Sequence, residues 1–288
     1  MRPQPEPLRI ALFVEGSQAA ASRRGDDLRS LWETLCATIG VARPEIVFPI
    51  DKKYLLALNL DTAQGGQRTK MSGASEGLDD LLRRHYGRTP FDAALVAWDL
   101  TPPWAMVTPD RCRWQETVAM YAHMVRRRRL PEPFLSWADR RAQELQGRDR
   151  PSARTGAPPL ERGAILPLCM ESCFESWFVD ERQGVCTGKN GLRQVLQVTG
   201  QRVLGWPEPF SKGDQRSAKN YLKDAISAVR RLRPPHPLTN KIRRGWDDNQ
   251  ESWARFLAEA LAARDPKAWR THPTATRLAE LLPLQARA

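Results

Sequence analysis

Short apolar runs alternate with longer amphipathic segments along the first 180 residues. The stretches "RIALFV", "PEIVFPI", "FDAALVAWDL" and "AILPLCM" have the length and apolar character of buried strands. Between them, apolar residues recur at intervals of three and four, which predicts helices over residues 24–39, 75–85 and 111–129. Strands that alternate with helices in this way are typical of an α/β fold with a mostly parallel central sheet flanked by helices.

The pattern changes after residue 180, where no further strong strand is found. Helices are predicted there over residues 191–196, 218–232, 250–263 and 274–282. A separate segment, residues 147–163, is rich in Pro, Gly and Arg and predicts a flexible loop. We therefore expect an α/β domain over residues 1–180 and a mainly helical C-terminal region over residues 181–288.

Acidic residues follow three of the predicted strands. Glu15 ends the first strand and Asp99 the third, while Glu171 and Glu175 come after the fourth and share one face of a predicted helix. Because the carboxyl ends of parallel strands meet at one edge of a sheet, these acids could converge there, and their oxygens suit Mg²⁺ or Mn²⁺. The alternatives are ordinary: Glu15 and Glu171 could be acids in the first turn of a helix, and Asp99 a turn former.

The chain carries 45 Lys and Arg against 33 Asp and Glu, a formal net charge of +12. This excess favours a polyanion, with nucleic acid as the leading candidate, although an arginine-rich genome could also inflate the count. No apolar run is long enough to span a membrane, the start "MRPQPEPLRI" lacks the apolar core of a signal peptide, and the five cysteines lack C-x-x-C spacing. We expect a cytoplasmic protein without a disulfide framework or a zinc site.

Several basic groups could hold a nucleic acid strand. Residues 126–129 are four consecutive arginines at the end of a predicted helix, where they would point in different directions and could equally be a solvated helix end. The segment "NKIRRGW" combines basic side chains with a tryptophan, as strand-binding surfaces do, although such a tryptophan is more often a core residue. The candidate nucleic-acid-binding residues are Arg23, Arg24, Arg126, Arg127, Lys212, Arg216, Lys219, Arg243 and Arg244.

The pieces "FVEGS", "AWDLTPP" and "CMESCFESWFVD", in this order, resemble the toprim fold, and specifically the toprim-like proteins of bacterial anti-phage defence loci that are often encoded with an ABC-type ATPase. The resemblance covers most of residues 8–180. It implies a Rossmannoid α/β domain and a nuclease that cleaves phosphodiester bonds with Mg²⁺ or Mn²⁺. By position it gives Glu15 the role of general acid/base or metal ligand and makes Asp99 and Glu175 metal ligands, with Glu171 in support.

The sequence departs from this family at one position, because Thr101 stands where toprim nucleases usually carry a second Asp. Two functions therefore stay open. One is a nuclease controlled by a partner ATPase, and the other is a non-catalytic toprim-like subunit that docks a partner or senses a ligand. The ten tryptophans and the amphipathic helix predicted over residues 250–263 exceed what a small helical appendage needs for its own core, so we also expect contact with another chain, either the ATPase or a second copy.

Overall fold

The fold was analysed in a computed structural model of the chain. It describes residues 8–15, 24–41, 44–50, 77–99, 114–146, 160–170, 175–179, 192–193, 198, 202–207, 215–235 and 273–282. The chain divides into two compact units, and each is described by itself. The first unit comprises Met1–Gln18, Pro44–Ala97 and Arg111–Leu168, and the second Ala19–Arg43, Trp98–Asp110 and Cys169–Ala288. Because these units interleave along the sequence, the domain boundary expected near residue 180 stays a prediction.

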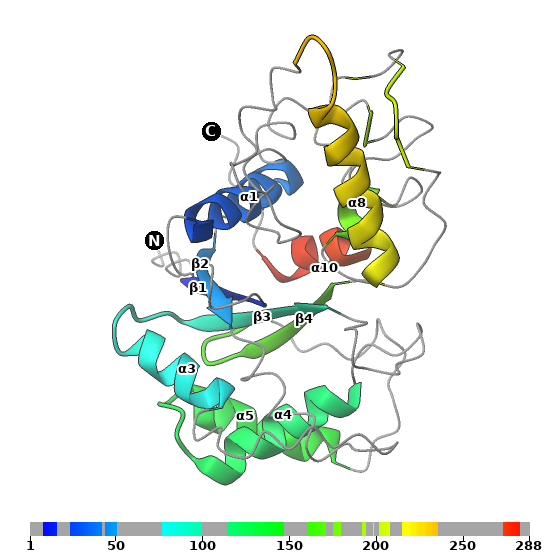
Figure 1. Ribbon diagram of the computed structural model, residues 1–288. Coiled ribbons are helices and arrows are strands. Elements are labelled where there is room, and N and C mark those ends of the chain that lie inside the picture. Colours follow the sequence, from blue (N-terminus) through cyan, green and yellow to red (C-terminus); the bar gives the residue numbers. More distant parts are fainter. Residues whose placement is uncertain are drawn as a thin grey trace. The chain divides into compact units, whose positions relative to one another are not determined.

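A sheet of four strands in the order β2-β1-β3-β4 forms the framework (Figure 1). The strands are β1 (Ile10–Glu15), β2 (Glu45–Ile50), β3 (Ala93–Asp99) and β4 (Ile165–Met170). β1 pairs in parallel with both β2 and β3, so that Phe13 lies beside Val47 on one side and Val96 on the other. The side chains from Ile10 to Val14 are all buried, which is why this strand reads as a continuous apolar run. The predicted α/β class and all four predicted strands are confirmed.

Three helices of the first unit lie on one side of the sheet (Figure 1). They are α3 (Leu78–Tyr86), α4 (Trp114–Arg127) and α5 (Phe134–Leu145). Aromatic rings join α3 and α5 to the sheet: the Phe13 ring centroid is 5.6 Å from that of His85 in α3, and the Phe91 ring centroid is 5.8 Å from that of Phe13 and 5.1 Å from that of Phe134 in α5. The Tyr121 hydroxyl of α4 donates a hydrogen bond of 2.6 Å to the carbonyl of Ile165 in β4. These contacts fix the positions of the helices that carry the charged site described below.

The second unit contains the remaining described helices. They are α1 (Arg24–Ile39), α6 (Ser176–Val179), α8 (Gln215–Arg230) and α10 (Pro273–Leu281). Leu31, Trp32 and Leu35 of α1 are fully buried, as the predicted apolar face requires, and α6 packs against α8. The helix expected over residues 250–263 lies outside the described residues. None of the described helices combines the length and the apolar character that a membrane crossing needs.

Two features of the first unit differ from expectation. The helix predicted to continue through residue 129 ends at Arg127, and Arg128 adopts a left-handed conformation with φ of 49°. Shortly afterwards the chain forms α5, which was not expected from the sequence. Its apolar residues, Phe134, Trp137 and Ala138, recur at intervals of three and four and are buried, so the signal was present in the pattern.

Candidate functional site

The carboxyl edge of the sheet holds two of the acids that the sequence singled out. Glu15 is the last residue of β1 and Asp99 is the last residue of β3. These strands are parallel neighbours and are in register as far as Val14 and Ala97, so both end at the same edge. The side chains of Glu15 and Asp99, and the whole of Glu171, lie outside what the structure describes. The convergence of their carboxyl groups therefore stays a prediction.

Glu175 belongs to the second unit and immediately precedes α6. Its side chain is almost fully buried, and Lys219 Nζ of α8 lies 3.8 Å from Glu175 Oε1. A buried carboxylate is costly unless a positive charge or a metal ion compensates it, and here the lysine supplies compensation. The structure thus joins two residues to which the sequence assigned separate roles, one as a metal ligand and the other as a nucleic-acid contact.

The described residues contain no group of three or more His, Cys, Asp or Glu side chains placed to hold a metal ion. A carboxylate metal site would therefore have to include side chains beyond the described part of the chain, as a site built on Glu15 and Asp99 does. Carboxylate oxygens are the donors that Mg²⁺ and Mn²⁺ prefer, so these residues suit such an ion by donor type.

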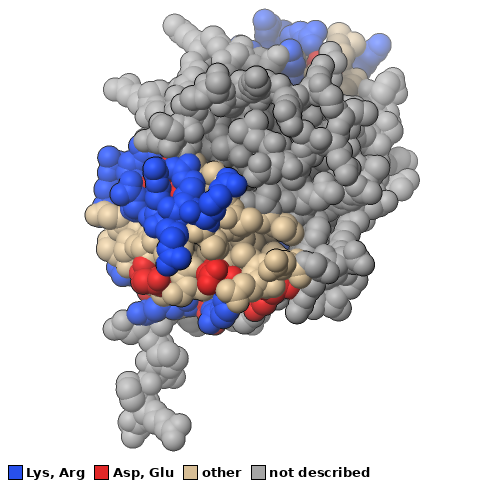
Figure 2. Space-filling model, turned by 90° about the horizontal axis from the view of Figure 1, so that it is seen from below, with Lys and Arg blue, Asp and Glu red and all other residues tan. Residues whose placement is uncertain are grey.

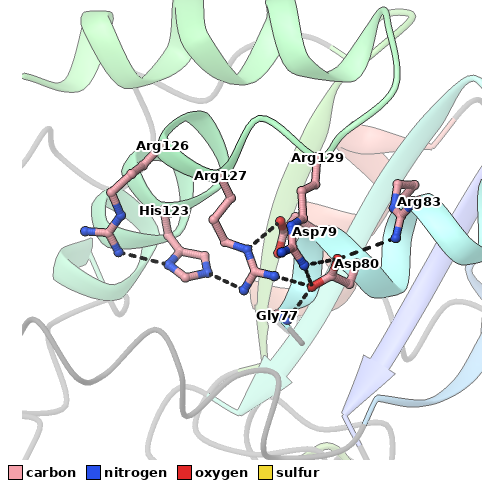
Figure 3. A network of polar contacts seen from close by, with 8 residues as sticks. All are labelled: Gly77, Asp79, Asp80, Arg83, His123, Arg126, Arg127 and Arg129. Atoms are coloured by element: carbon pink, nitrogen blue, oxygen red, sulfur yellow. Dashed lines mark hydrogen bonds and ion pairs between the residues drawn. The ribbon is translucent and has the colours of Figure 1, made fainter. Parts of the chain in front are cut away.

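A charged network between α3 and the end of α4 was not anticipated from the sequence (Figure 3). Asp79 and Asp80 lie in the first turn of α3, and both are buried. Three arginines contact these acids, and two more lie beside them in the sequence at the end of α4; we call all five the arginine cluster. It consists of Arg83, Arg126, Arg127, Arg128 and Arg129.

The two acids hold three of these arginines. Arg127 Nε lies 3.1 Å from Asp79 Oδ2, and its Nη2 donates to Asp80 Oδ2. Arg129 Nη1 donates to Asp80 Oδ1 at 3.0 Å, and Arg83 Nη2 lies 3.7 Å from the same oxygen. The early end of α4 explains this convergence, because the left-handed Arg128 takes Arg129 off the helix axis and back toward α3. Of the four consecutive arginines, Arg127 and Arg129 therefore meet at Asp80, whereas Arg126 contacts His123 instead.

His123 extends the network along α4 (Figure 3). Its Nδ1 lies 3.3 Å from Arg126 Nη2, and its Nε2 lies 3.5 Å from Arg127 Nη1. A guanidinium group only donates hydrogen bonds, and a neutral imidazole accepts through one nitrogen. At most one of these two contacts is therefore a hydrogen bond, and the imidazole acts mainly as a spacer between two guanidinium groups.

Gly77 allows this close packing at the start of α3. A Cβ atom on this residue would lie 2.6 Å from Asp79 Oδ1, 3.0 Å from His123 Nε2 and 3.1 Å from Arg127 Nη1. The Gly77 N–H also donates to Asp80 Oδ2 at 3.0 Å, so Asp80 satisfies one of the backbone donors at the helix start. A glycine at this position thus brings the backbone of α3 within reach of the α4 side chains.

The two neighbouring carboxyl groups differ in their electrostatics. Burial raises the pKa of Asp79, and the charge of Arg127 offsets this only in part. Burial also acts to raise the pKa of Asp80, but the hydrogen bonds from Gly77 and Arg129, with the charges of Arg127 and Arg129, outweigh it and lower that pKa. The hydrogen bond to Asp80 in turn raises the pKa of Arg129. Asp80 is therefore the principal anionic anchor of the arginine cluster.

The outer side chains of the cluster reach the surface. The side chains of Arg83 and Arg129 are 59% and 49% exposed, and Arg126 and Arg128 are exposed as well, whereas that of Arg127 is only 17% exposed. Figure 2 shows the molecule from below. Lys and Arg side chains gather on part of the surface seen in this view, with few acidic atoms among them. The surface is thus strongly basic although two acids lie beneath it.

The other basic candidates are not described in the same detail. Only the backbone is described for Arg24 and Arg216. The remaining four, Arg23, Lys212, Arg243 and Arg244, lie outside the described residues. Their binding roles stay predictions.

Comparison of the chain with protein-family models, with curated proteins and with solved structures finds no match.

Proposed function

We propose that the protein is a toprim-like nuclease that cleaves phosphodiester bonds of nucleic acid with Mg²⁺ or Mn²⁺. The observation that supports this most directly is the position of Glu15 and Asp99 at the ends of two neighbouring parallel strands in an α/β sheet. Ligands of open α/β sheets bind beyond the carboxyl ends of the strands. The finer fold proposal is a Rossmannoid domain of the toprim type with a helical C-terminal appendage.

The proposed roles follow from the chemistry of the side chains. Glu15 and Asp99, with Glu175 and Glu171, would hold the divalent ion, which when bound supplies Lewis-acid stabilisation of the charge on the reacting phosphate. Glu15 would also move the proton of the attacking water, as a carboxylate at a strand end can. Basic side chains would hold the strand through its phosphates and carry no part of the chemical step.

The test is cleavage of plasmid DNA and of RNA by the purified protein with Mg²⁺ or Mn²⁺, with and without an ABC-type ATPase encoded beside it. Glu15→Gln should reduce the rate by about 100-fold or more, because general acid/base groups contribute roughly 10²–10⁴-fold. Asp99→Asn should also reduce the rate, because it removes a carboxylate ligand of the divalent ion. A matched control is Glu280→Gln, since Glu280 is an exposed acid of α10 that pairs with Arg277. Equal rates in Glu15→Gln and the parent, at equal fold stability, would make the acids structural.

The second candidate is a non-catalytic toprim-like subunit. Two observations favour it: Thr101 replaces a second Asp, and Lys219 already compensates the charge of Glu175. In this case the parent would bind a partner or ligand, and no substrate would be cleaved with any of the metal ions. The same cleavage assay therefore separates the two candidates.

The proposed biological setting is anti-phage defence in the bacterial cytoplasm, with the ATPase as the controlling partner. Self-association is the alternative partner arrangement. The C-terminal segment on which this proposal depends lies largely outside the described residues, so its support is the sequence pattern alone.

A further inference from the structure

We infer that the arginine cluster between α3 and the end of α4 is a binding surface for the phosphate backbone of nucleic acid, in which Asp79 and Asp80 hold Arg83, Arg127 and Arg129 in place and the exposed arginines of the cluster contact phosphates. The inference concerns binding and not cleavage. It rests on the proposed function only in taking nucleic acid as the polyanion.

The first support is the charge balance. Three arginines, Arg83, Arg127 and Arg129, share the two carboxylates, so they carry more positive charge than both ionised acids can offset. If the cluster served only to join α3 to α4, the pairs made by Arg127 and Arg129 would suffice. Arg128 adds exposed positive charge and makes no ion pair with a carboxylate of the described residues. A surplus of this kind attracts anions and releases counterions when a phosphate binds.

The second support is preorganisation. Arg129 donates to Asp80 through Nη1, yet half of its side chain stays exposed. A guanidinium group carries five N–H donors in a rigid plane, so donors remain for a ligand after the carboxylate is satisfied. Because Asp80 holds the side chain in one arrangement, less conformational entropy is lost when a phosphate binds.

The third support is the arrangement of the side chains in a row. The contacts run from Arg126 through His123 and Arg127 to Asp80, and from there to Arg129 and Arg83 (Figure 3). A row of guanidinium groups fits a chain of phosphates better than a single phosphate group. Arginine is also suited to bidentate contacts with phosphate oxygens.

The nature of the surface favours nucleic acid over a membrane. Amphipathic helices that bind lipid surfaces combine basic residues with apolar side chains that enter the bilayer. Among the described residues, Leu204 is the one large hydrophobic side chain that is exposed, and it belongs to the second unit. The described part of the first unit thus offers charge without an apolar anchor.

The test measures binding without cleavage. Fluorescein-labelled single-stranded DNA, RNA and duplex DNA are titrated with the full chain in EDTA, and fluorescence anisotropy is recorded over a series of KCl concentrations. The test variant combines Arg83→Gln, Arg126→Gln and Arg128→Gln. The control variant combines Arg9→Gln, Arg140→Gln and Arg162→Gln, which removes the same charge from exposed arginines of the same unit that pair with Asp92 or Glu161. Circular dichroism and thermal unfolding confirm that each variant is folded.

The test variant should bind nucleic acid about tenfold more weakly or worse, with the slope of log K against log salt reduced by roughly 2 to 3, because each lost phosphate contact removes about 0.7–0.9 of slope. The control variant should stay close to the parent. Equal losses in the two variants would show a response to net charge alone and would overturn the inference, as would a parent that binds no nucleic acid at low salt. Binding of the parent to phosphatidylserine vesicles or to an acidic protein, without binding to nucleic acid, would overturn it too.

This binding test and the cleavage test can give different answers. Binding in EDTA needs no metal ion, so a parent that binds through the arginine cluster but never cleaves would sustain this inference while the nuclease proposal fails.

Discussion

Asp79 and Asp80 are adjacent in sequence, and both are buried in the first turn of α3, yet they make different contacts. Asp80 accepts hydrogen bonds from Gly77, Arg127 and Arg129, whereas Asp79 is compensated mainly by Arg127 Nε. Their pKa values consequently move in opposite directions, that of Asp79 up and that of Asp80 down. The local contacts of a carboxyl group, and not its burial alone, decide whether its charge stabilises the fold.

This difference predicts unequal costs of two conservative substitutions. Asp80→Asn should lower the free energy of unfolding by about 1.5–3 kcal/mol near neutral pH, the usual contribution of hydrogen bonds to charged groups. Asp79→Asn should cost clearly less, because ionised Asp79 is penalised by burial. Urea unfolding of both variants measures the difference, and an equal or larger cost for Asp79→Asn would contradict it.

The pH dependence of the stability should reflect the opposite pKa shifts of Asp79 and Asp80. The lowered pKa of Asp80 means that its contribution is present above the ordinary value of 3.8 and disappears as the pH falls through the lower folded value. The difference in the free energy of unfolding between the parent and Asp80→Asn should therefore become smaller at low pH. The raised pKa of Asp79 means that the parent loses stability as the pH rises from 3.8 through the higher folded value. The cost of Asp79→Asn, measured by urea unfolding over a pH series, should accordingly be larger near pH 3.8 than at neutral pH.

At the scale of elements, the end of α4 determines the arginine cluster. The Arg128 N–H still bonds to the carbonyl of Met124 at 3.1 Å, but the residue itself has φ of 49°, a conformation that favours glycine. A non-glycine residue in this region costs about 1 kcal/mol. The strain is compatible with a surface role for the Arg128 side chain, since a residue chosen for stability alone would be glycine.

Arg128→Gly should therefore raise the free energy of unfolding by about 0.5–1 kcal/mol, because glycine removes the left-handed strain. The same change should weaken nucleic acid binding, because it deletes one outer arginine of the cluster. Thermal unfolding and anisotropy titration of this variant measure the two effects separately. A matched comparison is Arg128→Gln, which should weaken binding without the gain in stability. A glycine variant no more stable than the glutamine variant would show that Arg128 is not strained.

At the scale of the whole molecule, the sequence predicted the framework better than the charged surface. The buried strands and the helices α1, α3 and α8 could be predicted because each element is defined by a local apolar period. The arginine cluster could not, because it depends on where α4 ends and on tertiary contacts of Asp80 with Arg127 and Arg129, which lie 47 and 49 residues further along the chain. Glu15 and Asp99 lie between these cases, since the strand topology alone brings their backbones to one edge of the sheet.

Binding and cleavage should be separable in the whole protein, because the arginine cluster lies on α3 and at the end of α4 and the proposed acids Glu15 and Asp99 lie at strand ends. Glu15→Gln should lose cleavage while its affinity for nucleic acid in EDTA stays within about twofold of the parent. The variant with Arg83→Gln, Arg126→Gln and Arg128→Gln should raise KM roughly tenfold and leave kcat nearly unchanged, as removal of uniform binding does. Steady-state kinetics over a wide range of substrate concentration measure both constants. A fall in kcat at saturating substrate would place the arginines in the chemical step and would contradict the separation of roles.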